Sequence, residues 1–357
     1  MAVEVAQNHP QVSSLFTDFP HDRIWLAAAL GSDGRRFFVD DAADPAVALA
    51  WHHMGICFLA ARSVEGAGSF LDGLFRLEHF PAIRYISLPD DAWAAAIHSQ
   101  FGNRFTPVQR VSFTFDPALW ERQSAALPPV PEEFTPRRID DAPAARIAAE
   151  IDPDFGSAWP DPVRFPEQSI GFCLLEGDKL AAVAYSAFPP NHGIEFSVAT
   201  APAHRGRGLC ALACAPLIDH CLAHGLEPHW STHAVNMPSR RAAARVGFPH
   251  ERLHFWVHHA PWNASRRSAP TSPAVLERLA GEYTRKNGQR VYFSAEDGTL
   301  TARFGSPQAS KITFEAESEL AFFLHESDAQ LLAPEDDAGG LMLLINGKEH
   351  PLTRVTG

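Results

Sequence analysis

The segment from Glu195 to Ala211 reads EFSVATAPAHRGRGLCA, and it decides the fold prediction. A strand-like run from Ile194 to Thr200 ends close to Pro202, and a short loop with two arginines and two glycines follows. A helical pattern begins directly after this loop. The first N–H groups of a helix lack partners and carry about half a positive charge, which suits an anion. Glycine lets the backbone approach phosphates and arginine adds countercharge, so the segment predicts a phosphate-binding loop.

Two well-known phosphate-binding loops are excluded by the spacing of this segment. A Walker loop would continue with Gly-Lys-Ser or Gly-Lys-Thr, which does not follow here. The dinucleotide-binding fingerprint needs a glycine spacing different from that of Gly206 and Gly208. Taken alone, the segment could also be a generic anion nest or a simple helix cap.

The loop resembles a signature of one enzyme superfamily. The run from Arg205 to Cys210 is similar to the Arg/Gln-x-x-Gly-x-Gly/Ala motif of the GNAT superfamily of acetyltransferases. A second motif of that superfamily combines Asn-x-x-Ala/Ser, a basic residue and Gly-Phe/Tyr. It is matched in register by Asn236, Ser239, Arg245, Gly247 and Phe248. Two motifs in the right order are much more specific than either one.

Finer resemblances extend to other parts of the chain. The stretch from Cys210 to Ser231 resembles the GNAT subgroup that includes zwittermicin A resistance proteins. The C-terminal part is similar to small β domains found behind some β-lactamase-like hydrolases, at 281–283, 297–300 and 322–323.

The superfamily resemblance implies an α/β (α+β) fold with a mixed, splayed central sheet and helices on both faces. It also implies acetyl-CoA as cosubstrate. The main chain of Val198, Ala199 and Thr200 would bind the pantetheine arm and polarise the thioester carbonyl. Asn236 would contact the CoA arm or align the leaving sulfur. The pyrophosphate would be bound by the loop and the first helical turn, at Arg205, Gly206, Arg207, Gly208, Leu209, Cys210 and Ala211.

Acetyl transfer to an amine needs a base, because only the neutral amine is a nucleophile. Glu195 is the first candidate, since the superfamily often places a carboxylate on this strand. His192 and His229 are the reserve bases, because an unperturbed imidazole titrates near neutrality. For each of these residues the alternative is a purely structural role.

The clearest departure from the superfamily pattern is Ala243. This position often carries a tyrosine that protonates the departing thiolate, which an alanine cannot do. The loss favours another acid, such as Tyr185 or His233, or a protein that binds acyl-CoA without catalysis. A thiol with a pKa near 8.5 can also leave largely as the anion.

Pairs of cysteines and histidines invite a metal interpretation. The pairs are Cys210 and Cys214, His220 and His224, and His229 and His233. A zinc site needs four ligands that converge at fixed geometry, whereas free cysteines are commonly small buried hydrophobes. We therefore expect no metal.

Charge and cysteine content limit the function classes. The formal net charge of -12 argues against a general nucleic-acid binder. No apolar run is long enough to cross a bilayer, and the first ten residues do not form a signal peptide. Five cysteines, three of them within 210–221, do not form a disulfide framework. We expect a cytoplasmic protein without membrane or nucleic-acid partners, and an oligomer is compatible with the sequence.

Proline-rich stretches at 127–131 and 263–273 predict three domains, at 1–130, 131–262 and 274–357. The first reads as an α/β domain, either a degenerate GNAT-like half or an unrelated fold. It opens with an expected hairpin in which Ile24–Leu30 and Arg36–Val39 flank the turn 31–34. The third reads as a small antiparallel β meander or barrel.

Together these features predict an acetyltransferase that moves acetyl from acetyl-CoA to a primary amine of a small molecule. Transfer would proceed by direct attack in a ternary complex, because no cysteine stands beside an evident histidine partner. The subgroup resemblance suggests an antibiotic or another aminated natural product as acceptor. A protein amine, a hydroxyl acceptor and a non-catalytic acyl-CoA sensor are the alternatives.

Overall fold

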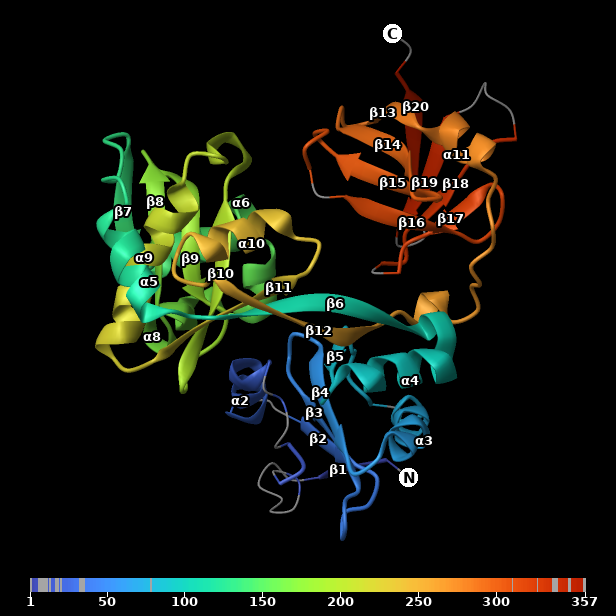
Figure 1. The fold of residues 1–357 in the computed structure, drawn as a ribbon, viewed down its shortest axis with the longest axis horizontal. Coiled ribbons are helices and arrows are strands. Elements are labelled where there is room, and N and C mark those ends of the chain that lie inside the picture. The colour runs from blue at the N-terminus through green and yellow to red at the C-terminus, as the bar shows by residue number, and fades with distance from the viewer. Residues whose placement is uncertain are drawn as a thin grey trace. The chain divides into compact units, whose positions relative to one another are not determined.

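The computed structural model forms two compact units, which are described separately (Figure 1). The larger unit comprises Met1–Trp93 and Gln109–Trp256, and the smaller comprises Ala94–Val108 and Val257–Gly357. The residues that the structure describes are 2–5, 12, 14–16, 19, 21–31, 36–77, 79–309, 311–325, 327–335, 340–345 and 348–355.

The larger unit is built on a sheet of twelve described strands, two of which continue into the smaller unit. The strand order is β1-β2-β3-β4-β5-β12-β6-β11-β10-β9-β8-β7. In chain order the strands are β1 (Val3–Val5), β2 (Arg36–Val39), β3 (Val47–Trp51), β4 (Ile56–Ala61), β5 (Tyr85–Ser87), β6 (Phe105–Thr114), β7 (Phe134–Arg138), β8 (Gly171–Glu176), β9 (Lys179–Ser186), β10 (Gly193–Thr200), β11 (Glu227–His233) and β12 (His250–His259).

Helices cover both faces of the middle strands. On one face Phe196 of β10 shares a core with Leu217 of α9. On the other face Val183 of β9 packs in a core with Ile147 of α6 and Phe155 of α7. The prediction of a mixed α/β sheet with helices on both faces is therefore confirmed. Within the described residues before the C-terminal barrel, the α-helices are α2 (Arg23–Gly31), α3 (Val64–Leu74), α4 (Asp91–Phe101), α5 (Pro117–Ala125), α6 (Asp141–Glu150), α7 (Asp154–Ala158), α8 (Phe165–Gln168), α9 (Leu209–Ala223) and α10 (Met237–Ala244).

The neighbouring strands β10 and β11 pair in parallel over only three residues. Their register begins at Gly193 opposite Glu227 and ends at Glu195 opposite His229. Beyond that point β10 pairs with β9, and β11 pairs with β6. The strands therefore diverge, as the splayed sheet of the sequence prediction requires.

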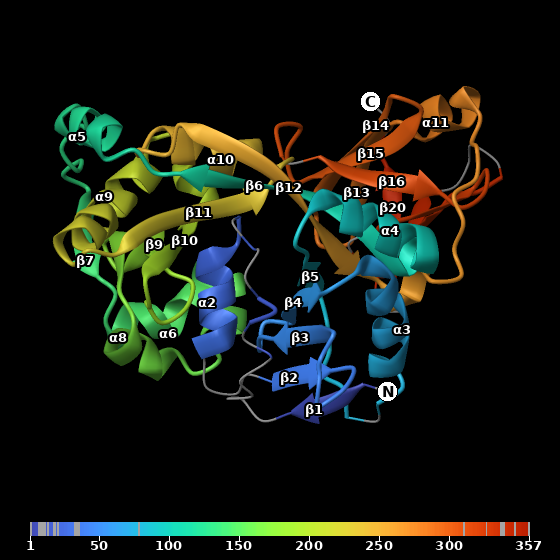
Figure 2. The ribbon, with the colours of Figure 1, turned by 60° about the horizontal axis from the view of Figure 1, so that its bottom comes forward.

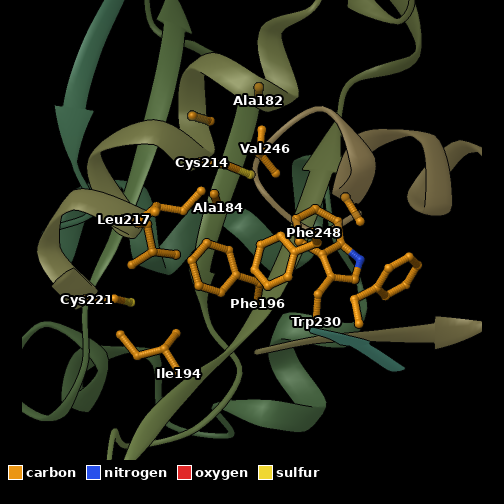
Figure 3. Close-up of a cluster of buried hydrophobic side chains, with 14 of the residues drawn as sticks. Ala182, Ala184, Ile194, Phe196, Cys214, Leu217, Cys221, Trp230, Val246 and Phe248 are labelled. Carbon is orange, nitrogen blue, oxygen red and sulfur yellow. The ribbon is translucent and has the colours of Figure 1, made fainter. Parts of the chain in front are cut away.

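A cluster of three aromatic rings lies where the strands diverge (Figure 3). Phe196 and Trp230 directly follow the last paired residues, and their rings stack with centroids 6.0 Å apart. Phe248 packs on both, at 6.0 Å from Phe196 and 5.6 Å from Trp230. All three side chains are buried, and they pack in the core that these strands form with α9.

The first and middle parts of the chain exchange strands within this sheet. The final strand of the middle part, β12, lies between β5 and β6 of the first part. Strand β6 in turn pairs antiparallel with β11, from Trp230 opposite Phe113 to His233 opposite Arg110. The two parts therefore share one sheet, and a domain boundary near residue 130 stays a prediction.

The smaller unit contains a closed antiparallel barrel, which confirms the prediction of a separate C-terminal β structure. The strands follow one another in chain order, and β13 closes the barrel against β20. Its elements are α11 (Pro273–Leu279), β13 (Gly281–Arg285), β14 (Arg290–Glu296), β15 (Thr299–Phe304), β16 (Ile312–Ala316), β17 (Ala321–Phe323), β18 (Gln330–Leu332), β19 (Leu341–Ile345) and β20 (Lys348–Arg354).

The hairpin predicted at the start of the chain is wrong in its first arm. Residues 24–30 lie in helix α2, which buries Ile24, Trp25, Leu26, Ala28 and Ala29. Alanine is the strongest helix former, and the run Ala27-Ala28-Ala29 outweighs the apolar pattern that suggested a strand. Most of the predicted turn, 32–34, lies outside the described residues. Helix α2 packs against β10 and against β3 and β4 (Figure 2).

No helix within the described ranges is both long enough and apolar enough to span a membrane.

The start of β10 depends on a glycine. A Cβ at Gly193 would lie 2.4 Å from the carbonyl oxygen of Glu227 and 2.8 Å from Cδ1 of Ile24. We expect Gly193→Ala to lower the free energy of unfolding by about 1–3 kcal/mol, because the parallel pairing must shift to make room. Urea unfolding followed by tryptophan fluorescence measures this, since Trp230 and Trp256 lie in the larger unit. The control Gly156→Ala, where the nearest atom is 3.6 Å away, should not destabilise. Equal stability of both variants would contradict the prediction.

Candidate functional site

The point where β10 and β11 diverge holds a buried pair of ionisable side chains. Glu195 and His229 are only 2% and 5% exposed, and His229 Nδ1 forms an ion pair with Glu195 Oε2. The other carboxylate oxygen, Oε1, accepts hydrogen bonds from the Ser231 amide at 3.1 Å and from its hydroxyl at 2.8 Å. Both oxygens of Glu195 therefore have hydrogen-bonding partners. His229 contacts Glu195 through Nδ1, and its other ring nitrogen, Nε2, takes no part in this pair.

The electrostatics of the pair favour a protonated His229. Burial lowers the pKa of His229, but the adjacent Glu195 carboxylate raises it through charge and hydrogen bonding, and the pKa lies above its ordinary value. Glu195 thus orients the imidazole and stabilises its charged form, as the carboxylate of a His–carboxylate pair does.

A second carboxylate is linked to the pair through Arg110. The buried guanidinium of Arg110 donates to the Ser231 hydroxyl at 2.8 Å and lies 4.0 Å from the centre of the Trp256 ring. It interacts electrostatically with both Asp22 and Glu195. Negative and positive groups therefore alternate through the interior from Asp22 to His229, which lets each charge be buried.

Asp22 is held in place by side chains of two strands, β5 and β12. Its Oδ2 accepts hydrogen bonds from Ser87 Oγ and Trp256 Nε1, each at 2.6 Å, and His254 Nε2 lies 3.4 Å from Oδ1. Burial raises the pKa of Asp22, but His254, Ser87 and Arg110 outweigh burial and lower it to about 2. Asp22 is therefore ionised at neutral pH.

The glycine loop has the backbone shape expected of an anion site. Gly206 and Gly208 have φ of 79° and 81°, in the left-handed region that favours glycine, and α9 begins at the next residue. A Cβ at either position would meet no atom of the chain within 4 Å, so the space beside the loop is open. Leu209 is buried, while Cys210 and Ala211 are half-buried in the first turn.

Both loop arginines have partners within the chain. Arg205 Nε donates to the Thr200 carbonyl at 3.2 Å. Arg207 forms an ion pair with Glu133 and lies 4.8 Å from the centre of the Phe134 ring. The Arg207 pair is exposed to solvent, where such pairs are worth at most about 1 kcal/mol.

The remaining cofactor candidates lie on β10 and at the start of α10. Val198, Ala199 and Thr200 pair with β9 on one side, beyond the point where registered pairing with β11 ends. Asn236 is the N-cap of α10, and its Oδ1 accepts from the Ser239 amide at 3.2 Å.

The other catalytic candidates are not joined to the Glu195–His229 pair. His192 is exposed in the turn before β10, where its carbonyl accepts from the Glu227 amide at 3.0 Å. Tyr185 is buried and its hydroxyl donates to Asp152 at 2.7 Å. Burial and Asp152 raise the pKa of Tyr185 well above its ordinary value, so the phenol holds its proton firmly. Ala243 is fully buried in the core, so a side chain from this position faces other apolar groups.

In the part of the chain that the structure describes, no group of three or more His, Cys, Asp or Glu side chains could hold a metal ion. Cys210 and Cys214 both lie on α9, and Cys214 is buried in the apolar core.

Sequence reasoning missed Ser231, Arg110 and Asp22 as members of this site. They come from β11, β6 and the residue before α2, and only the strand order brings them together, so no local pattern could have identified them.

Comparisons with known proteins agree with this architecture. The family model described as GNAT acetyltransferase matches residues 13–253. A GCN5-related N-acetyltransferase-like protein from Streptococcus suis is 24% identical, with a TM-score of 0.56, over 71% of this chain and 98% of that chain. A GNAT-family acetyltransferase from Colwellia psychrerythraea is 13% identical, with a TM-score of 0.45, over 72% and 98%. A tandem GNAT protein from the clavulanic acid biosynthesis pathway is 14% identical, with a TM-score of 0.47, over 73% and 99%. No curated protein matches the chain.

The buried Asp22 carboxylate makes stability depend on acid pH. Its pKa is lowered from 3.8 to about 2, so its contribution is present above pH 4 and is lost as the pH falls through 2. We expect Asp22→Asn to remove on the order of 2 kcal/mol of unfolding free energy at pH 7, with a smaller difference from the wild type near pH 2. Urea unfolding at several pH values measures this. Asp44→Asn, which breaks an exposed pair with Arg62, is the control and should change little. A difference for Asp22→Asn that stayed constant with pH would contradict the prediction.

Proposed function

The chain belongs to the GNAT acetyltransferase family, and from this premise we propose that it transfers an acetyl group from acetyl-CoA to a primary amine of a small molecule. The observation that carries the proposal is the buried Glu195–His229 pair at the divergence of β10 and β11, on the strand that leads into the glycine loop. Glu195 of the buried pair, the opened strand edge and the glycine loop thus follow one another along β10 and its loop, and His229 joins them from β11.

Acetyl-CoA would bind along β10 with its pyrophosphate at the start of α9. The amide groups of Gly206 to Cys210 would donate to the pyrophosphate oxygens, since the Ala211 amide already donates to the Gly208 carbonyl at 3.1 Å. Arg207 would exchange its weak exposed pair with Glu133 for a pyrophosphate contact. The main chain of Val198, Ala199 and Thr200 would hold the pantetheine arm, and a free backbone N–H there would stabilise the oxyanion. Asn236 would use its amide NH₂ toward the arm while Oδ1 caps α10.

His229 is the better candidate for the base than Glu195. Both oxygens of Glu195 already accept hydrogen bonds, so the carboxylate acts by orienting His229 and stabilising its charged form. In the proposed step the amine nitrogen forms a bond to the acetyl carbon, the C–S bond breaks, and the amine proton passes to His229 Nε2. The CoA sulfur leaves as thiolate and takes its proton from solvent.

The acceptor class and the alternative function rest on separate observations. The resemblance to zwittermicin A resistance proteins favours an aminated natural product, such as an antibiotic, in the cytoplasm. The buried Ala243 supports the alternative of a non-catalytic acyl-CoA sensor, because it supplies no acid for the thiolate. Transfer of the acetyl group to an alcohol is a further alternative.

The test of the proposal is release of free CoA thiol from acetyl-CoA in the presence of amines. Turnover with at least one small amine and none with matched alcohols is the expected result. Calorimetric binding of acetyl-CoA without turnover on any amine or alcohol would favour the sensor and reject the proposal.

The pH dependence of turnover distinguishes His229 from Glu195 as the base. Because Glu195 raises the pKa of His229, kcat/KM should rise with pH through a pKa above that of ordinary histidine. Glu195→Gln removes this charge, so the rise of kcat/KM with pH should occur at lower pH. His229→Gln should reduce kcat by about 10²–10⁴ and abolish this rise.

The control for this series is His224→Gln, an exposed histidine at the end of α9, which should leave the profile unchanged. A rise of kcat/KM with pH that persists in His229→Gln would show that another group is the base.

The glycine loop is tested by a backbone substitution. Gly208→Ala places a Cβ at φ 81°, which costs about 1–2 kcal/mol or displaces the first turn of α9. We expect acetyl-CoA affinity to fall about tenfold by calorimetry, because the displaced amides lose the pyrophosphate. Gly225→Ala at the opposite end of α9 has a similar φ of 66° and equally open surroundings, and it should leave affinity unchanged. An equal loss of acetyl-CoA affinity in both variants would show that the effect comes from backbone strain and would contradict the assignment of the loop.

A further inference from the structure

The larger unit contains a cavity of about 760 Å³ beside the start of β10. Its walls come from α2, the turn after β3, the segment from α7 to α8 and the loop after β9. The first part of the chain (1–130) therefore supplies one side of the cavity, and the middle part (131–262) supplies the other. The lining residues are Ala27, Ala28, Gly31, His52, His53, Ala158, Trp159, Pro160, Asp161, Arg164, Gln168, Phe188, Pro189, Pro190 and Asn191.

The cavity adjoins the strand that carries Glu195. The amide of Ala187 donates to the Glu195 carbonyl at 2.9 Å, and the next residue, Phe188, lines the cavity. Trp159 is fixed to the same place, because its Nε1 donates to the Ser186 carbonyl at 3.1 Å. The cavity wall at Phe188 is therefore one residue and one main-chain hydrogen bond away from the backbone of Glu195.

One lining residue, His52, carries a buried hydrogen-bond donor without an acceptor. His52 is 2% exposed, and its Nδ1 accepts from the Met54 amide at 3.4 Å. Burial and the neighbouring His53 lower the pKa of His52 to about 3, so the ring is neutral and its proton lies on Nε2. Among the residues that the structure describes, none accepts from this Nε2. A buried donor left unpaired costs about 1–3 kcal/mol, and a ligand oxygen would recover it.

The surrounding walls favour a flat apolar body. The rings of Trp159 and Phe188 line the cavity, and α2 contributes only Ala27, Ala28 and Gly31. The Phe188 ring is held edge-on by His52 at 5.8 Å and by Trp25 at 4.7 Å. Charged side chains are confined to the exposed Asp161 and Arg164.

We propose that this cavity binds the acetyl acceptor as a drug-sized amine on a ring scaffold, whose hydroxyl or carbonyl oxygen accepts a hydrogen bond from His52. This inference rests on the proposed function, since it names the acceptor of that reaction. Cavities of roughly 300–1,000 Å³ hold ligands of drug size, whereas a lysine side chain would leave most of this volume empty. His52 would be a specificity-determining residue: it selects the oxygen and takes no part in proton transfer.

The test uses ring amines in matched pairs that differ by one oxygen, such as tyramine and phenethylamine, together with larger aminated ring compounds. For the wild type we expect the oxygenated member of at least one pair to have a 10–100-fold higher kcat/KM. His52→Phe keeps the ring and removes the donor. In this variant the KM for the oxygenated amine should rise to that of its partner, which abolishes the preference. The kcat and the KM for acetyl-CoA should stay unchanged, and the unfolding temperature should not fall.

A matched control is Ser169→Ala, which also removes a buried polar group without a partner and does not line the cavity. Its preference for the oxygenated amine should equal that of the wild type. A preference that survives in His52→Phe, or one that Ser169→Ala removes equally, would overturn the assignment of His52.

Direct binding separates this inference from the proposed function. Calorimetry with the same amines, without acetyl-CoA, should detect the oxygenated member in the wild type and weaker binding in His52→Phe. Binding without turnover would reject the transferase and leave the cavity assignment standing. Turnover of small alkyl amines without binding of any ring amine at millimolar concentration would support the transferase and reject the cavity assignment.

Discussion

The structure of the larger unit depends on the short parallel pairing of β10 with β11. The pairing ends at Glu195 and His229, and the rings of Phe196 and Trp230, the next residue of each strand, stack in the core beneath α9. Had the strands stayed paired, the ladder would have used the main-chain groups that face β11. Because β10 continues beside β9 and β11 continues beside β6, the opening belongs to the fold of the chain itself.

The buried charges follow from the same divergence. Glu195 and His229 face each other at the last paired position, and Ser231 and Arg110 lie on the strands that continue beside them. Isolated, each charge would be expensive to bury, but alternation of sign from Asp22 to His229 offsets that cost. The arrangement needs residues from both the first and the middle part of the chain, which explains why the first part belongs to the catalytic unit.

Local features of this protein could be predicted from its sequence, and long-range ones could not. The strand, glycine loop and helix from Ile194 to Ala223 are specified by neighbouring residues, and they form as expected. Glu195 and His229 were each candidates, but their contact depends on a strand register that no local pattern encodes. Arg110 and His52 act through tertiary contacts alone, so the sequence carries no sign of their roles. The strand predicted at Ile24–Leu30 is a helix, because a buried helix and a buried strand are equally apolar over nine residues.

The insertion of β12 between β5 and β6 bears on how the chain is made. Strand β5 ends at Ser87 and β6 at Thr114, which a ribosome delivers 163 and 136 residues before β12 begins at His250 (250 − 87 and 250 − 114), so the nascent first part has a gap in its sheet throughout this interval. Most domains fold as they emerge, N-terminal first. In this chain the sheet of the first part cannot be completed in that order. Strands β5 and β6 keep an edge without its native partner until nearly the whole larger unit has been synthesised, and such edges can pair wrongly.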